Sequence, residues 1–201
     1  MEDTFRTIEM PSEGLFKDKG SRFIAFAFPV NSEEEIKEIV QSIKKEHHSA
    51  RHHCYAWQLG VEKSLFRAND DGEPSSTAGK PILGQIQSFD LTNILIVVVR
   101  YFGGTLLGVS GLINAYRNAA LDAINKAGVI EKLVEKWLLI EFDYSAMNEV
   151  MKVFKDEKLL QINPQFDLKC KVKTHIRLRE SNRIVQELLK IDTVVVIPIE
   201  R

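Results

Sequence analysis

Three separate stretches of this sequence concentrate residues that can bind or react. In the first, Arg100 and Tyr101 follow an apolar run and precede Gly103, Gly104 and Gly108. Glycines leave the backbone free to approach another group closely. A helix that begins behind such a loop presents unpaired N–H groups and the positive end of its dipole. The stretch is therefore a candidate anion site.

A structural interpretation of the same glycines stays open. The loop matches neither the GxxxxGK[ST] phosphate loop nor the dinucleotide GxGxxG pattern, and it contains no lysine. Glycines also allow a helix to pack closely against a strand. In that case Arg100 would be a packed arginine paired with a carboxylate.

The second stretch, residues 69–89, gathers carboxylates and hydroxyls on a loop, where binding residues tend to lie. Turn residues open it, and Ser76 or Thr77 could cap a helix with Pro81 in its first turn. A hydrolase would need two carboxylates of different proton affinity, or a hydroxyl beside a base such as His52. Gly72 belongs to the turn, and the polar residues concerned are Asp70, Asp71, Glu73, Ser75, Ser76 and Thr77.

Four histidines lie just before this loop, at positions 47, 48, 52 and 53. A metal site needs ligands that converge on one point. Adjacent residues of a strand point to opposite faces, so His52 and His53 are poorly placed to share an ion. We expect no metal site and no cofactor.

In the third stretch, residues 169–179, basic residues alternate strictly with apolar or small ones. One set of side chains is apolar or small, which is typical of a strand with one buried face. Glu141, Asp143 and Asp167 on neighbouring strands could neutralise three of the charges on the other face, and the rest would form a candidate RNA-binding stripe. The basic residues on this other face are Lys169, Lys171, Lys173, His175, Arg177 and Arg179.

The elements that must position these stretches follow from periodicity. Residues 94–99 form an unbroken apolar run that predicts a central strand covered on both faces. A helix follows it and ends at Gly128. Residues 4–10 and 21–30 predict an opening antiparallel pair. Ser32 and Glu35 form a capping box for the next helix, and further strands are expected at residues 50–59 and 65–68.

From residue 134 onward the pattern changes to β-α-β-β-α-β, the ferredoxin-like order. We therefore expect an α+β protein with domains at residues 1–133 and 134–201. The second domain's strands are expected at residues 137–144, 159–168, 169–178 and 193–199, with helices at residues 145–157 and 180–191.

Composition limits the possible functions. Of 201 residues, 44% are hydrophobic and 27% charged, and 27 basic residues against 28 acidic ones give a net charge of −1. The molecule as a whole has no field that would attract nucleic acid or a membrane. Cys54 and Cys170 lie in apolar surroundings, as expected of buried thiols in a reducing compartment. With no apolar N-terminal segment, we expect a cytoplasmic protein without a membrane anchor.

Three motifs, ARHHCYAW, DDGEPSSTAGKPIL and VRYFGGTLLGVSGL, resemble in order and spacing the bacterial YigZ family, whose N-terminal domain is shared with IMPACT. The resemblance implies a ribosomal protein S5 domain 2-like domain followed by a ferredoxin-like domain similar to one in elongation factor G. Ser76, Leu106 and Asn114 depart from the usual glycine, lysine and arginine. The motif positions carried over are His52, Asp71, Gly72, Glu73, Pro74, Ser75, Thr77, Ala78, Gly79, Arg100, Tyr101, Gly103, Gly104 and Gly108.

The resemblance to IMPACT implies a translation regulator that works by binding. The leading hypothesis is therefore a non-enzymatic protein that contacts RNA, the ribosome or a translation-related protein. One alternative is a hydrolase using His52 with Asp71 or Glu73 beside Arg100. A second alternative is a pure protein-interaction module. What copurifies with the chain would separate the three.

Overall fold

The computed structural model describes residues 3–199, which divide into two compact units. The first comprises residues 5–132, and the second comprises residues 133–199 together with residues 3 and 4. These two N-terminal residues fall within the predicted first domain, residues 1–133. They group with the second because the Asp3 carbonyl accepts a hydrogen bond of 2.7 Å from the Val134 N–H, and the Asp3 carboxylate pairs with Arg177.

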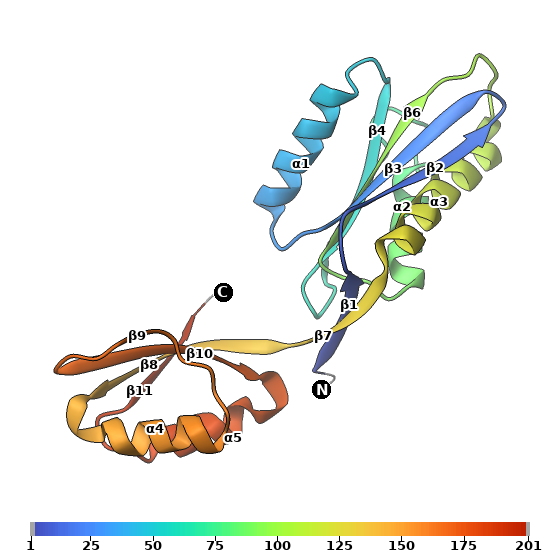
Figure 1. Cartoon of the computed structure of the whole chain (residues 1–201). Coiled ribbons are helices and arrows are strands. Elements are labelled where there is room, and N and C mark those ends of the chain that lie inside the picture. The colour runs from blue at the N-terminus through green and yellow to red at the C-terminus, as the bar shows by residue number, and fades with distance from the viewer. Residues whose placement is uncertain (1–2, 200–201) are drawn as a thin grey trace. The chain divides into compact units, whose positions relative to one another are not determined.

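The first unit is built on a five-stranded antiparallel sheet in the order β2-β3-β6-β4-β5 (Figure 1). Its middle strand, β6, is the predicted central strand, and all six residues from Ile94 to Val99 are fully buried. The prediction of a strand covered on both faces is confirmed. The strands are β2 (Ser12–Asp18), β3 (Ser21–Pro29), β4 (His52–Leu59), β5 (Leu65–Asn69) and β6 (Ile94–Tyr101).

Helices cover both faces of this sheet. Ile96 and Val98 pack with α2 (Gly79–Ser88) and α3 (Gly108–Ala127) in one hydrophobic core. Leu95, Val97 and Val99 lie in a second core with α1 (Glu33–Glu46). Because consecutive strand residues point to opposite faces, a continuous apolar run suits a strand between two helical layers.

The helix ends follow the predicted signals. The Ser32 hydroxyl accepts a hydrogen bond of 3.2 Å from the Glu35 N–H, and the Glu35 carboxylate accepts one from the Asn31 N–H, which closes the start of α1. Helix α3 ends at Gly128, whose φ of +73° favours glycine. None of the helices in the described residues has the length and apolarity to cross a membrane.

The opening strand pair was predicted wrongly. The partner of β3 is β2, joined by Lys19 and Gly20, which both have positive φ (+44° and +79°), as in a type I′ hairpin turn. Strand β1 (Thr4–Ile8) pairs instead with β7 (Val129–Leu133). The hairpin lacks the usual Asn-Gly signal, and a partner 121 or more residues away leaves no local trace in the sequence.

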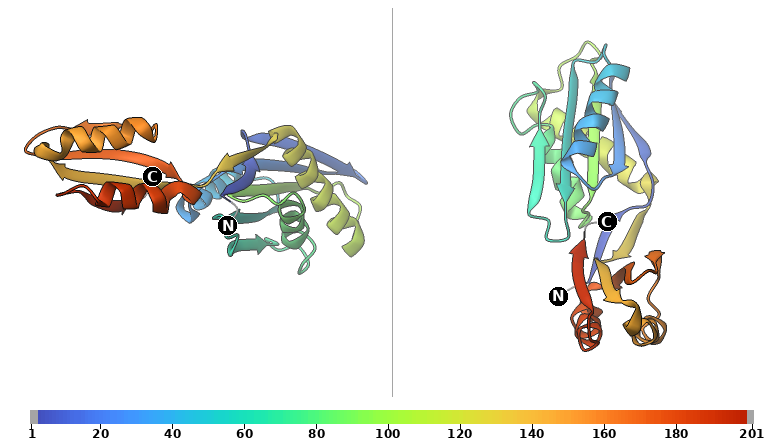
Figure 2. Two further views of the ribbon diagram at one scale, coloured as in Figure 1. Left: turned by 90° about the horizontal axis from the view of Figure 1, so that it is seen from below. Right: turned by 90° about the vertical axis from the view of Figure 1, so that its left-hand side faces the viewer.

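The second unit has the predicted element order β-α-β-β-α-β. Its sheet order is β11-β8-β10-β9, so β10 lies between β8 and β9, as predicted. Helices α4 and α5 pack on one face of the sheet (Figures 1 and 2). Strand β9 is much shorter than the predicted 159–168. The elements are β8 (Glu135–Asp143), η1 (Tyr144–Ala146), α4 (Met147–Asp156), β9 (Ile162–Gln165), β10 (Lys169–Arg177), α5 (Leu178–Leu189) and β11 (Val195–Ile199).

Candidate functional site

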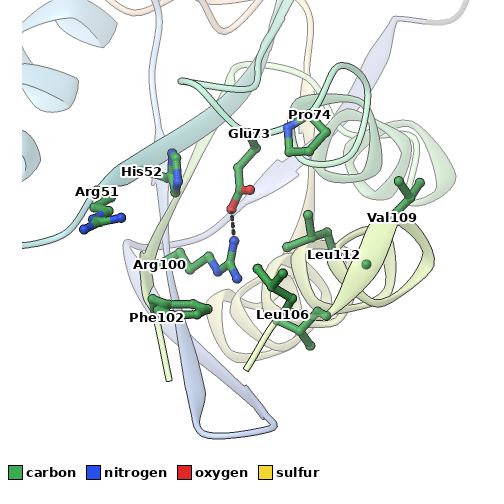
Figure 3. Close-up of a pocket in the computed structure, with 11 residues that line it drawn as sticks. Arg51, His52, Glu73, Pro74, Arg100, Phe102, Leu106, Val109 and Leu112 are labelled. Atoms are coloured by element: carbon green, nitrogen blue, oxygen red, sulfur yellow. Dashed lines mark hydrogen bonds and ion pairs between the residues drawn. The ribbon is translucent and has the colours of Figure 1, made fainter. Parts of the chain in front are cut away.

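A pocket of about 510 Å³ lies in the first unit, between the ends of the sheet and the start of α3 (Figure 3). All three sequence motifs contribute to it: the first supplies His52, the second Glu73, and the third Arg100. His52 and Arg100 are direct register partners on β4 and β6. Most of the remaining wall is apolar, made by Pro74, Phe102, Leu106, Leu107, Val109 and Leu112.

The Glu73–Arg100 ion pair lies in the pocket wall. Arg100 Nη1 donates a hydrogen bond of 2.6 Å to Glu73 Oε1, and only 8% and 3% of the two side chains are exposed. The Tyr116 hydroxyl donates to the same oxygen at 2.8 Å. The guanidinium also lies over the rings of Phe23 and Phe102, at 5.5 and 5.6 Å from their centroids. Both charges are therefore fixed and mutually neutralised.

Behind this pair, Cys54 is unsuited to act as a nucleophile. Its Sγ lies 3.3 Å from the Tyr116 hydroxyl and 3.0 Å from the Asp70 carbonyl oxygen. Burial raises the pKa of the Cys54 thiol well above its ordinary value, and nearby carboxylates raise it further. Burial likewise raises the pKa of Tyr116. Both groups stay protonated at neutral pH and serve as hydrogen-bonding core residues.

His52 presents one ring nitrogen that nothing in the described chain engages. Its Nδ1 lies 2.9 Å from the carbonyl oxygen of Asp71. A carbonyl only accepts, so Nδ1 carries the proton of the neutral ring and Nε2 holds the lone pair. The hydrolase alternative would orient this ring with a carboxylate. Here the carboxylate of Asp71 is directed elsewhere and that of Glu73 is bound to Arg100.

Asp71 links the loop that follows β5 to β4 and α1 through hydrogen bonds. Its carboxylate accepts hydrogen bonds from the His53 N–H (2.7 Å) and from Lys44 Nζ (2.8 Å). Burial by itself raises the pKa of Asp71, but the bonds from Lys44 and His53 outweigh burial and hold the pKa below its ordinary value of 3.8. The carboxylate is therefore ionised and fully committed to structure near neutral pH.

The helix cap predicted at Ser76 or Thr77 is wrong. The N-cap residue of α2 is Ala78, whose side chain has no capping group. The Asp70 carboxylate performs this task from outside the helix and accepts hydrogen bonds from the N–H groups of Ser76, Ala78 and Gly79 at 2.8–3.0 Å. The Thr77 hydroxyl donates to the Pro74 carbonyl. A cap supplied eight residues upstream lies outside the usual sequence signature.

Several predicted site residues lie outside the pocket wall. The Tyr101 hydroxyl lies 2.9 Å from Nδ1 of His47, the C-cap residue of α1. A Cβ on Gly103 would lie 1.9 Å from the carbonyl carbon of Gly20, so Gly103 allows a close approach to the turn between β2 and β3 and not the predicted packing of a helix on a strand. The other residues outside the wall are Asp71, Gly72, Ser75, Thr77 and Gly104.

The start of α3 reaches the pocket without a cap. Gly108, its first residue, lines the pocket, while Leu107 supplies no side-chain cap and the first turn contains no acid. Leu106 and Asn114 stand where the family pattern has a lysine and an arginine, and of these two only Leu106 lines the pocket. Asn114 is exposed and hydrogen bonds with Asn118.

The basic strand of the second unit is largely neutralised. Lys171 pairs with Glu141 at 2.6 Å, as predicted. Arg177 pairs with Asp3, a partner that the sequence pattern did not indicate. Strand β10 ends at Arg177, so Arg179 lies on α5 and not on the predicted strand, and it also pairs with Asp3. In the described part of the chain, Lys169 and Lys173 make no ion pair. His175 contacts Glu135, which was not among the predicted partners. The Asp167 carboxylate, predicted to pair with a basic residue of the strand, accepts a hydrogen bond from the Leu168 N–H.

Residues 3–199 contain no group of three histidine, cysteine or acidic side chains placed to hold a metal. His53 lies against the α1 side, with its Nε2 at 3.1 Å from the His47 carbonyl, whereas His52 lines the pocket. The two adjacent imidazoles are directed apart, as the strand periodicity predicts.

Comparison with known proteins identifies the first unit. Residues 19–124, which contain all the pocket residues, match the Impact N-terminal domain. The chain is 32% identical to IMPACT family member YvyE of Bacillus subtilis (strain 168), over 89% of this chain and 82% of that protein. It therefore belongs to the IMPACT family, and the resemblance inferred from the motifs is confirmed.

Other relatives match over shorter parts. IMPACT family member YigZ of Escherichia coli (strain K12) is 43% identical over 54% of each chain, and the protein IMPACT homolog of Saccharomyces cerevisiae (strain ATCC 204508 / S288c) is 33% identical over 44% of its length. The chain thus spans about half of these two relatives. A crystal structure of a hypothetical protein covers all of both chains, with a TM-score of 0.75 and 27% identity.

Proposed function

We propose that this chain is a cytoplasmic, translation-associated regulator that acts by binding rather than by catalysis. The link to translation rests on the resemblance to IMPACT. The binding mode rests on one observation: apart from His52, the groups in or behind the pocket that could act as a nucleophile, acid or base are already bound to one another. Glu73 is neutralised by Arg100, and Cys54 is held as a thiol beside Tyr116.

The hydrolase alternative has less support. His52 is the only pocket residue with a free basic nitrogen in the described structure, and no serine, threonine or cysteine is among the residues that line the pocket. A general base without an oriented nucleophile or a carboxylate partner lacks the usual parts of a catalytic set. Loss of a defined hydrolytic activity in His52→Ala, with folding intact, would reverse this conclusion.

A capture experiment from native cytosol tests the proposed function. Tagged wild-type protein should retain ribosomal particles or a translation-related protein, and Leu106→Asp at the pocket should lose them. Leu65→Asp, which places the same charge on an exposed leucine of β5 outside the pocket, is the matched control and should retain them. Equal capture by both variants would exclude the pocket as the binding site.

We also propose the finer fold assignments: an S5 domain 2-like first unit and a ferredoxin-like second unit similar to a domain of elongation factor G, with the boundary near residue 133. The support for the second is its element order together with the sheet order β11-β8-β10-β9.

RNA contact through β10 is a second candidate. Lys169 and Lys173 lie on the same exposed face of the strand and have no carboxylate partner in the described residues. The ion pairs of Lys171, Arg177 and Arg179 leave less unpaired positive charge than the alternating sequence pattern predicts. If both lysines contact phosphate, a plot of the logarithm of the RNA-binding constant against the logarithm of the salt concentration should have a slope of about two units. The double variant Lys169→Gln with Lys173→Gln should abolish this salt dependence.

A further inference from the structure

We infer that the pocket of the first unit receives a segment of a partner protein in which a large apolar side chain lies next to a carboxylate. This inference rests on the proposed function and names the chemistry of the partner at that site. Three observations carry it: an exposed apolar rim, an excess of positive charge, and the small number of free cations.

The rim of the pocket exposes an unusual amount of apolar surface. Phe102, Leu106 and Val109 are 51%, 82% and 59% exposed, and all three line the same pocket. Scattered apolar side chains on a surface are ordinary, but a cluster around a concavity marks a contact site. Interfaces commonly place an apolar anchor of one protein in such a pocket of the other.

The polar groups of the pocket favour a negative charge beside that anchor. Glu73 cancels Arg100, which leaves Arg51 at the pocket edge as a permanent charge without an ion pair or hydrogen bond among residues 3–199 (Figure 3). Arg100 is itself 7% exposed, and its buried Nε has no hydrogen-bond partner. The uncapped start of α3 adds the positive end of a twenty-residue helix.

The small number of unpaired cations in the pocket favours a peptide over a nucleic acid. A nucleotide or RNA segment brings several phosphate charges and is bound by several cations. This pocket offers one unpaired arginine and a wall that is mainly apolar. A single aspartate or glutamate next to a leucine, methionine or phenylalanine matches both properties.

A random heptapeptide phage library, panned against the full chain, tests this without choosing a sequence in advance. Selected peptides should be enriched in a large apolar residue adjacent to aspartate or glutamate. Binding of one selected peptide should weaken about two- to fivefold in Arg51→Gln, as expected for an exposed charge pair, and at least about tenfold in Leu106→Asp.

Arg67→Gln is the matched control, because it removes the same charge from an exposed site on β5 and should leave affinity unchanged. Enrichment without acidic residues, enrichment of basic residues, or no enrichment would each overturn the inference. So would decanoate binding at the pocket with no peptide binding, which would point to a free amphipathic acid. If peptides bind as expected but native cytosol yields no translation component, the proposed function fails and the pocket chemistry stands.

Discussion

Glu73 and Arg100, 27 residues apart in sequence, form an ion pair of 2.6 Å in which both side chains are more than nine-tenths buried. A buried pair contributes modestly when intact because both ions lose their hydration, whereas an unpaired buried ion is costly. Arg100→Leu should therefore lower the free energy of unfolding by about 3–5 kcal/mol.

The double variant Glu73→Leu with Arg100→Leu should recover much of that loss, since it leaves no buried charge. Urea unfolding of the two single variants and the double variant measures this coupling. A double variant that is less stable than either single variant would show that Glu73 is stabilised mainly by Tyr116.

Asp71 should make stability depend on pH in the acid range. Its pKa is lower in the folded protein than its ordinary 3.8, so the ionised carboxylate stabilises the fold above that pH, and the contribution is lost as pH falls through the folded value. Asp71→Asn should cost about 1–2 kcal/mol at pH 7. The difference from wild type should shrink below about pH 4, as urea midpoints at pH 7, 5 and 3 would show. A constant difference would contradict this assignment.

Two glycines should respond oppositely to the same substitution. Gly103→Ala would place a Cβ 1.9 Å from the backbone of Gly20 and should destabilise the protein by at least about 2 kcal/mol. Gly84, in helix α2, has open space around the added atom, so Gly84→Ala should stabilise by about 0.5–1 kcal/mol. Thermal unfolding of both variants measures the contrast, and equal effects would show that the contact with Gly20 relaxes easily.

Both thiols should resist modification in the folded protein. Cys54 and Cys170 are fully buried, and burial raises the pKa of Cys54. A disulfide reagent such as DTNB at pH 8 should release almost no chromophore from native protein and two equivalents in denaturant. Rapid reaction of one thiol in the native state would reveal local opening of its unit.

The sequence predicted the elements whose cause is local. The apolar run of β6, the capping box of Ser32 and Glu35, and the glycine that ends α3 each depend on a few adjacent residues. The hydrolase alternative grouped His52, Glu73 and Arg100, and these three side chains line one pocket because His52 and Arg100 are register partners and Glu73 binds Arg100. Asp71, Gly103 and Gly104, which the same motifs offered, lie outside its wall.

Partnerships between distant residues could not be predicted in the same way. Asp3 neutralises Arg177, 174 positions away in the sequence. The periodicity of the strand shows which residues share a face but gives no indication of this distant partner. The Asp70 cap of α2 depends on how its loop folds back. In both cases a carboxylate with several local alternatives finds its partner only through tertiary structure.

The strand order of the first unit also determines when this unit can assemble during synthesis. Strands β3 and β4 are not neighbours, because β6 lies between them and is made later. At about 5–20 residues per second, the roughly 40 residues from the end of β4 to the end of β6 take about 2–8 s to emerge. Throughout that interval the nascent chain contains β3 and β4 without the strand that pairs with both. Their apolar side chains and unpaired backbone groups are then exposed, and this is when a chaperone would have the most surface to shield.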